Sequence, residues 1–185
     1  LFLVASGGWP ILLIGLLGLT AGLCYSAGPR PLSATPLGEA MVVLFFGLAA
    51  VGGTYLLQAG ALAASAIVVG LMQGAFAAAV LHLNNTRDAE GDRAAGRRTL
   101  AILLGPSRSL LLYDLLLAVP FVLAGVLAVA MSDLRPWLTL LALPEASLLA
   151  LALQRASLAA DYNRLLGRTV NLQVLFTALL ALSLL

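Results

Sequence analysis

The strongest constraint in this sequence is a series of six long apolar segments separated by short polar stretches. They cover approximately residues 9–26, 38–58, 61–83, 107–131, 136–153 and 169–185. A helix needs about 20 apolar residues to cross a bilayer, and these segments are continuous, unlike the alternating strands of a transmembrane barrel. We therefore predict an all-α fold, a polytopic transmembrane helical bundle. Residues 1–5 are expected to end one further helix.

Composition supports this interpretation. The chain is 62% hydrophobic and 10% charged, whereas soluble domains contain about 25% charged residues. Small residues let membrane helices approach closely, so Gly70 and Gly74 are predicted to form a helix contact. The single cysteine, Cys24, excludes an internal disulfide. The high apolar and low charged content excludes an ordinary soluble domain.

The beginning of the chain does not resemble a targeting segment. It reads Leu-Phe-Leu-Val-Ala, without a Met, a basic region or a small-residue cleavage site. We expect residues 1–185 to be a single transmembrane domain whose N-terminal part is missing from this sequence.

The arginines predict the orientation of the bundle. If six helices alternate in direction, nine arginines fall on one face and only Arg135 on the other. The nine are Arg30, Arg87, Arg93, Arg97, Arg98, Arg108, Arg155, Arg164 and Arg168. Because positive residues accumulate on the cytoplasmic side of membrane proteins, we expect that face to be cytoplasmic. The expected location is the cell (inner) membrane.

Residues 84–106 form a dense charged stretch in this apolar chain, with three of its eight acids and four of its ten arginines. Asn84, Asp88 and Asp92 have helical spacing, which places their side chains along one face. Their hard oxygen donors suit Mg²⁺. Arginines suit phosphate oxygens, and this stretch contains Arg87, Arg93, Arg97 and Arg98. The pattern predicts a site for a cation-bridged diphosphate, with a solvated loop of mixed charge as the alternative.

This site is expected to be one half of a larger one. A diphosphate normally requires more than two carboxylates, and the other acids do not supply a second pair. Asp133 falls on the opposite face, and Asp161 has no second acid at helical spacing. We therefore expect the partner acids to precede residue 1.

The charged stretch also resembles a known motif. The pattern Asn84-Asn85-x-Arg87-Asp88-x-x-x-Asp92-x-x-x-Gly96-Arg97-x-Thr99-Leu100 is similar to the second aspartate-rich motif of the UbiA superfamily of intramembrane prenyltransferases. The stretch Tyr25-Ser26-Ala27-Gly28-Pro29-Arg30-Pro31-Leu32, followed by Gly38-Glu39, resembles a loop of its menaquinone branch, the 1,4-dihydroxy-2-naphthoate polyprenyltransferases. The resemblance covers nearly the whole chain and implies a protein of about nine helices, six of which are present here.

The resemblance implies an enzyme that uses Mg²⁺ to transfer a polyprenyl group from polyprenyl diphosphate to an aromatic acceptor. For 1,4-dihydroxy-2-naphthoate in menaquinone biosynthesis, the products are demethylmenaquinone, diphosphate and CO₂. The partners are then these two substrates and the lipid bilayer, and neither a nucleic acid nor a protein partner is implied.

The resemblance also implies roles for individual residues. The expected metal ligands are Asp88 and Asp92, assisted by Asn84 or Asn85. The expected diphosphate contacts are Arg87, Arg93 and Arg97. Tyr25 corresponds to a tyrosine near the prenyl cation, with an interfacial anchor as the alternative. Arg30 is a candidate for binding the carboxylate of the acceptor, with a charge that only sets orientation as the alternative.

Other functions remain possible at the level of the sequence. A related prenyltransferase could use hydroxybenzoate, homogentisate or a haem precursor as its acceptor. A transporter could use Asp88 and Asp92 as a cation site, although such sites usually lie near the midplane. A structural membrane subunit would leave the charged cluster unexplained. Two further residues are noted: His82 is expected to be packed or hydrogen-bonded, and Glu145 is predicted to lie at mid-membrane, where it is protonated, faces the interior or marks a helix break.

Overall fold

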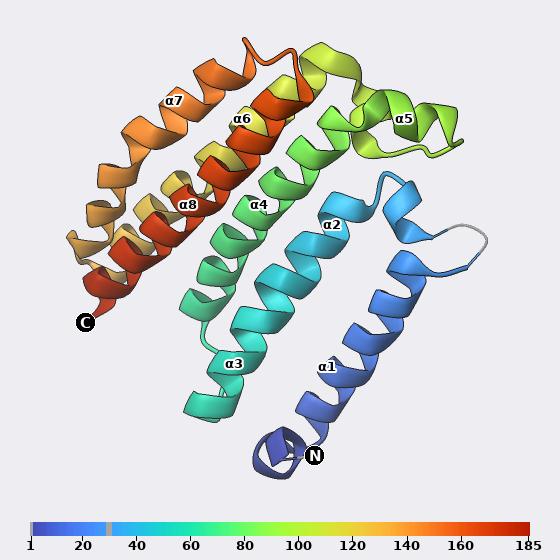
Figure 1. Ribbon diagram of the computed structural model, residues 1–185. Coiled ribbons are helices and arrows are strands. Elements are labelled where there is room, and N and C mark those ends of the chain that lie inside the picture. The colour runs from blue at the N-terminus through green and yellow to red at the C-terminus, as the bar shows by residue number, and fades with distance from the viewer. Residues whose placement is uncertain (1, 29–30) are drawn as a thin grey trace.

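The computed structural model describes residues 2–28 and 31–185, and this part of the chain is a bundle of helices that alternate in direction (Figure 1). The elements are α1 (Phe2–Ser26), η1 (Leu32–Ala34), α2 (Gly38–Val42), η2 (Val43–Ala49), α3 (Ala50–Ala59), α4 (Ala64–Arg87), α5 (Ala89–Ala94), α6 (Leu100–Met131), η3 (Arg135–Ala142), α7 (Leu143–Leu153) and α8 (Ala159–Leu184). The predicted all-α fold is confirmed.

Six helical segments among the described residues are long and apolar enough to cross a membrane. Two of them are composite: α2, η2 and α3 join into one span over Gly38–Ala59, and η3 and α7 join into another over Arg135–Leu153. In α1, Gly8 has a φ of 68°, which kinks the helix. The short helical stretch before this kink lies where the end of a preceding helix was expected.

One helix begins earlier than predicted. The helical residues of α6 start at Leu100, but Gly105 has a φ of 73° and kinks α6, so its long part begins close to the predicted residue 107. α8 begins at Ala159 rather than near residue 169. Asp161 caps α8 by accepting hydrogen bonds from the backbone N–H groups of Ser157 and Leu158. The first turns of α8 are helical but polar, so apolar segment length alone does not reveal them. Arg164 and Arg168 consequently lie on α8 rather than in the preceding loop.

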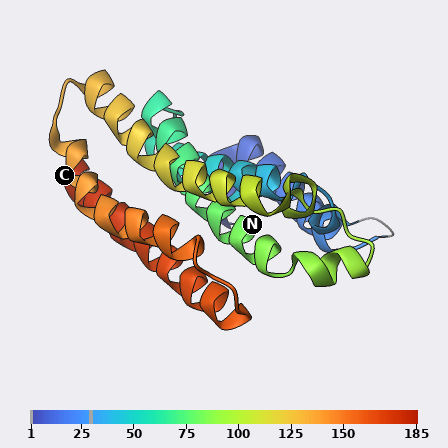
Figure 2. The ribbon, with the colours of Figure 1, turned by 90° about the horizontal axis from the view of Figure 1, so that it is seen from above.

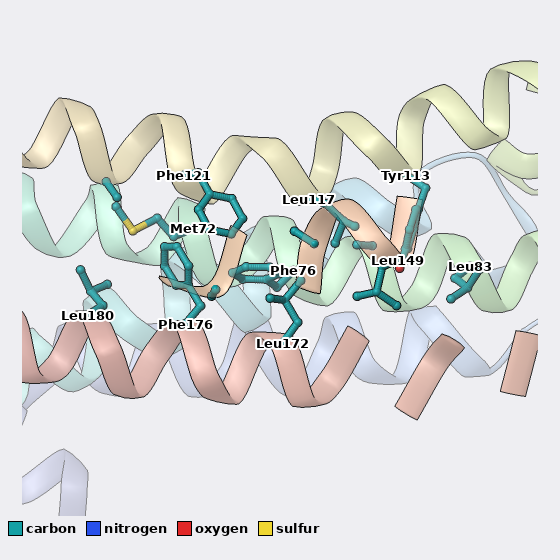
Figure 3. Packing of buried hydrophobic residues seen from close by; sticks show 14 of the residues in the cluster. Met72, Phe76, Leu83, Tyr113, Leu117, Phe121, Leu149, Leu172, Phe176 and Leu180 are labelled. Carbon is teal, nitrogen blue, oxygen red and sulfur yellow. The ribbon is translucent and has the colours of Figure 1, made fainter. Parts of the chain in front are cut away.

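α4 lies at the centre of the bundle and packs against η2, α6 and α8. α7 and α8 lie beyond it on one side, and α1 lies on the other side (Figures 1 and 2). The core between α4, α6 and α8 contains Phe76, Phe121 and Phe176 (Figure 3). The rings of Phe76 and Phe121 each meet Phe176 edge to face, with centroids 5.1 and 5.2 Å away, a favoured aromatic geometry. This core holds α4 and α8 side by side.

Glycines allow α4 and η2 to touch backbone to backbone. A Cβ on Gly47 would lie 2.8 Å from the Cα of Gly74, and a Cβ on Gly74 would lie 2.9 Å from the Cα of Val43. Gly70 faces the same contact, because a Cβ there would lie 3.2 Å from the Gly47 carbonyl oxygen. The predicted helix contact of Gly70 and Gly74 is therefore confirmed, and its partner is η2.

Glu145 lies where the 3₁₀ helix η3 gives way to α7, directly after Pro144. Its Oε1 accepts a hydrogen bond from Nε of Arg168 on α8 at 2.9 Å. The span changes helix type near Glu145 but is not broken there, and the carboxylate has a charge partner. An ion pair is the usual way to accommodate a charge inside a membrane span.

The α5 end of the bundle, which we define as the end that carries η1, α5 and the loop at residues 154–158, collects the arginines. Arg87, Arg93, Arg97, Arg98 and Arg155 lie there, while Arg135 follows α6 at the opposite end (Figure 1). Arg30 lies outside the described residues. These five arginines and Arg135 keep the predicted asymmetry, whereas Arg168 lies within α8 and pairs with Glu145.

A substitution at the glycine contact tests the packing of α4 on η2. Gly74→Leu places a side chain against the Val43 backbone, and overpacking typically lowers the free energy of unfolding by about 1–3 kcal/mol. Unfolding in a denaturing detergent, followed by circular dichroism, measures this loss. Gly15→Leu on α1 is the control, because a Cβ there meets nothing within 4 Å. Equal stability of the two variants would contradict the contact.

Candidate functional site

The charged stretch begins in the last turn of α4 and continues through α5. Asp88 separates the two helices, with φ −91° and ψ 3°. The helical hydrogen bonds nevertheless continue across it: the N–H of Asp88 donates to the Asn84 carbonyl at 3.1 Å, and the N–H of Asp92 donates to the Asp88 carbonyl at 2.9 Å. The spacing that predicted one face is therefore largely preserved in the backbone.

Arg87 is the centre of the polar contacts in this region. Its Nε and Nη2 donate to Oδ1 and Oδ2 of Asp88 at 2.7 and 2.8 Å, a bidentate pair. Nη2 also donates to Oδ1 of Asn84 at 2.8 Å, and Nη1 donates to Oδ1 of Asn163 on α8 at 2.6 Å. Oxygen atoms from two helices thus converge on one cationic group.

The same contact determines the charge state of Asp88. The hydrogen bonds from Arg87, together with its charge, lower the pKa of the Asp88 carboxyl below its usual range. The Asp88 side chain is 42% exposed, so the carboxylate stays hydrated and accessible. Asp88 is consequently ionised at neutral pH, as a hard-metal ligand must be.

Asp92 is buried and paired separately. Its Oδ1 accepts a hydrogen bond from Nη1 of Arg97 at 2.9 Å, and its carbonyl accepts one from the Arg97 backbone N–H. Within residues 2–28 and 31–185, no three His, Cys, Asp or Glu side chains gather closely enough to hold a metal ion. The structure therefore brings Asn84 and Asp88 together and holds Asp92 beside Arg97.

Asn85 points in a different direction from Asn84. Its Nδ2 donates to Oε1 of Glu39 at 3.1 Å, in a buried network that also includes His82. Nδ1 of His82 lies 3.0 Å from the same Glu39 oxygen, and Nε2 lies 3.1 Å from the Ser109 carbonyl oxygen. His82 is hydrogen-bonded, as predicted. Of the two asparagines, only Asn84 adjoins Asp88.

The remaining predicted residues lie around this centre. Tyr25, half-buried at the end of α1, lines a cavity of about 650 Å³ with Phe45 and Phe46. Glu39 and Arg97 are close enough to act on its phenol electrostatically. Arg93 is exposed on α5 and forms no ion pair with any described residue. The prediction for Arg30 concerns a residue outside the described ranges.

An apolar groove of about 550 Å³ starts beside Asn84 and runs between α2–η2, α4 and α8. Ala77 and Val80 line it from α4, and Val170 and Gln173 line it from α8. Asn84 follows Ala77 by seven positions on α4, which is about 10 Å along the helix axis. Asn84 therefore connects the polar cluster around Arg87 to one end of this apolar groove.

Two residues of this region were not predicted to belong to a site. Asn163 reaches Arg87 from another helix, and Glu39 joins the network around Asn85. Each contact connects positions more than forty residues apart, so local spacing carries no signal for it. The resemblance around Gly38 and Glu39 did single out the segment, although it assigned Glu39 no role.

The helices and the polar cluster define a class of protein: a multi-pass membrane protein that carries a charged site at one end of its bundle. Comparison with known sequences gives the family. A profile described as the UbiA prenyltransferase family matches residues 1–180. The chain therefore belongs to the UbiA prenyltransferase family.

Individual members of the family are similar in sequence to this chain. A 1,4-dihydroxy-2-naphthoate octaprenyltransferase of Haemophilus influenzae is 33% identical over 174 residues, which cover 93% of this chain and 56% of the relative. The UbiA prenyltransferase domain-containing protein 1 of Homo sapiens is 36% identical over 158 residues, covering 85% of this chain and 45% of the relative. The chain spans about half the length of the curated relatives it matches.

Proposed function

We propose that the protein transfers a polyprenyl group from polyprenyl diphosphate to an aromatic acceptor in a Mg²⁺-dependent reaction. One observation carries this proposal: in a member of the UbiA family, Arg87 gathers Asn84 and Asp88 at the mouth of an apolar groove. A polyprenyl diphosphate has the matching form, with a strongly anionic head and a long apolar tail.

The donor set fits one corner of a magnesium site. Asn84 and Asp88 offer an amide oxygen and a carboxylate, and their oxygens already converge on a cation, the Arg87 guanidinium. Mg²⁺ is usually held by one or two carboxylates together with waters and substrate phosphates. When bound, it would supply positive charge to the departing diphosphate oxygens. We assign Asn84 and Asp88 as ligands, with Asp92 as a further one, since Arg97 bonds its Oδ1 and no described side chain bonds its Oδ2.

The arginines are assigned to the diphosphate. Arg87 contacts both carboxylate oxygens of Asp88, so it competes with a metal for them, and we propose that it turns from Asp88 when that carboxylate binds Mg²⁺. A guanidinium freed in this way can bind phosphate oxygens through two parallel hydrogen bonds. Arg97 is placed similarly beside Asp92, and the exposed Arg93 can reach the same anion from α5.

The groove between α4 and α8 is assigned to the polyprenyl tail. It begins at Asn84 and is lined by small and apolar side chains such as Ala77, Val80 and Gly167. An allylic cation that forms as diphosphate leaves must be protected from water, and these walls offer no nucleophile. Tyr25 borders the neighbouring cavity, where its ring face can stabilise a nearby cation.

The acceptor we favour is 1,4-dihydroxy-2-naphthoate, as in the menaquinone branch. The support is the printed name of the Haemophilus influenzae relative and the Tyr25–Leu32 and Asn84–Leu100 motifs. We place the α5 end on the cytoplasmic side of the cell membrane, because arginines accumulate there. Arg30 is retained as the candidate partner of the acceptor carboxylate.

An acceptor panel tests the reaction itself. The full-length protein in membranes receives a polyprenyl diphosphate and Mg²⁺ with dihydroxynaphthoate, hydroxybenzoate or homogentisate, and mass spectrometry identifies the product. We expect prenyl transfer to dihydroxynaphthoate with loss of CO₂, and its disappearance when a chelator removes the metal. Transfer only to another acceptor would assign the protein to a different branch of the family. Transfer to none of the three would refute the proposed function.

Substitutions of the acids test the site. Asp88→Ala and Asp92→Ala should each abolish prenyl transfer while leaving membrane insertion intact, because each removes a charged ligand without touching a spanning segment. Glu90→Ala is the matched control, since Glu90 is an exposed acid on α5 in the same stretch, and it should retain activity. Full activity of either aspartate variant would disprove its assignment.

A further inference from the structure

Glu39 is a buried carboxylate at the beginning of α2 that the proposed reaction does not use. It is 5% exposed. Its Oε1 is shared by His82 Nδ1 and Asn85 Nδ2, and its Oε2 is buried without a hydrogen bond from any described residue. Both of its hydrogen bonds therefore go to α4, and His82 continues the connection to the Ser109 carbonyl on α6.

Helix geometry connects this network to the site. Successive residues on an α-helix are rotated by about 100°, so a residue and its fourth successor share a face while its neighbour points elsewhere. Holding Asn85 inward toward Glu39 therefore directs Asn84 and Asp88 toward the groove mouth. The same rotation keeps Asn84 and Asp88 within reach of one cation.

Packing alone does not account for a carboxylate at this position. Apolar residues of similar volume often hold neighbouring elements together as well as a buried ion pair does. Hydrogen bonds, in contrast, have a required direction and distance, so they fix the rotation of a helix as well as its proximity. The two hydrogen bonds of Glu39 fix the orientation of α4 about its own axis, because both come from one turn of that helix.

We propose that Glu39 is a positioning residue for the metal site: through Asn85 and His82 it sets the rotation of the last turn of α4 and thereby the direction of the Asn84 and Asp88 oxygens. This inference rests on the proposed function, because it assumes that these oxygens hold a metal. Its requirement is geometric: the side chain at position 39 must place one oxygen within hydrogen-bond reach of both Asn85 Nδ2 and His82 Nδ1.

Three substitutions separate length from charge. Glu39→Gln keeps an acceptor oxygen at the same reach, Glu39→Asp keeps the charge but withdraws it by one methylene, and Glu39→Leu removes it. Thr54→Ala is the control on the same span, where the Thr54 hydroxyl is exposed and bonds only its own helix. The readout is the affinity of full-length purified protein for Mn²⁺ with inorganic pyrophosphate, measured by electron paramagnetic resonance, alongside kcat and KM.

We expect Glu39→Asp and Glu39→Leu to weaken Mn²⁺ binding roughly tenfold or more, the usual effect of removing a residue that orients a metal ligand. Glu39→Gln should restore most of the affinity, and Thr54→Ala should match the wild type. If Glu39→Leu does not fold, the Asp and Gln variants still decide the question.

Two results would overturn the inference while the wild type binds Mn²⁺. One is wild-type affinity in the Asp variant. The other is an affinity in Glu39→Gln as weak as in Glu39→Asp, since an oxygen at the right reach would then not be sufficient and the negative charge would also be required. Failure of the wild-type protein to bind Mn²⁺ with pyrophosphate would instead refute the metal site of the proposed function, and the inference with it.

Discussion

A bilayer core supplies no hydrogen-bond partners, and this constraint governs the whole structure. Backbone groups are satisfied within helices, and several polar side chains inside the spans are paired with one another. Glu145 meets Arg168 between α7 and α8, and Gln173 donates to Gln73 between α8 and α4. Most other charged groups lie toward the ends of the bundle, with Asp114 inside α6 as an exception. The concentration of acids and arginines at the α5 end is therefore informative, because the rest of the chain avoids them.

That constraint also explains how a site for an anionic head and an apolar tail can arise. α4 is apolar along most of its length and polar in its last turn, so one helix supplies both a wall of the groove and the side chains proposed as ligands at its end. α8 does the same from the opposite direction, with Asn163 near its beginning and Val170 in the groove. The aromatic core between the two helices keeps these halves aligned.

Much of this architecture could be predicted from the sequence. Apolar segment length identified six spans, and the spacing of Asn84 and Asp88 identified the face on which they meet. The predicted first residue of α8 was wrong by ten residues, because the polar first turns of this helix give no hydropathy signal. Sequence also could not separate Asn84 from Asn85 or find Asn163, since those distinctions depend on helix rotation and on contacts between distant segments.

The account depends most directly on Asp88 and Asn84 holding the metal that binds the diphosphate. An experimental structure of the full-length protein with Mg²⁺ and an unreactive thio-analogue of a polyprenyl diphosphate tests this. It should place Mg²⁺ about 2.0–2.1 Å from oxygens of Asp88 and Asn84, with Arg87 turned from Asp88 to the diphosphate and the tail between α4 and α8. A metal bound elsewhere, with the Arg87–Asp88 pair intact, would contradict the account.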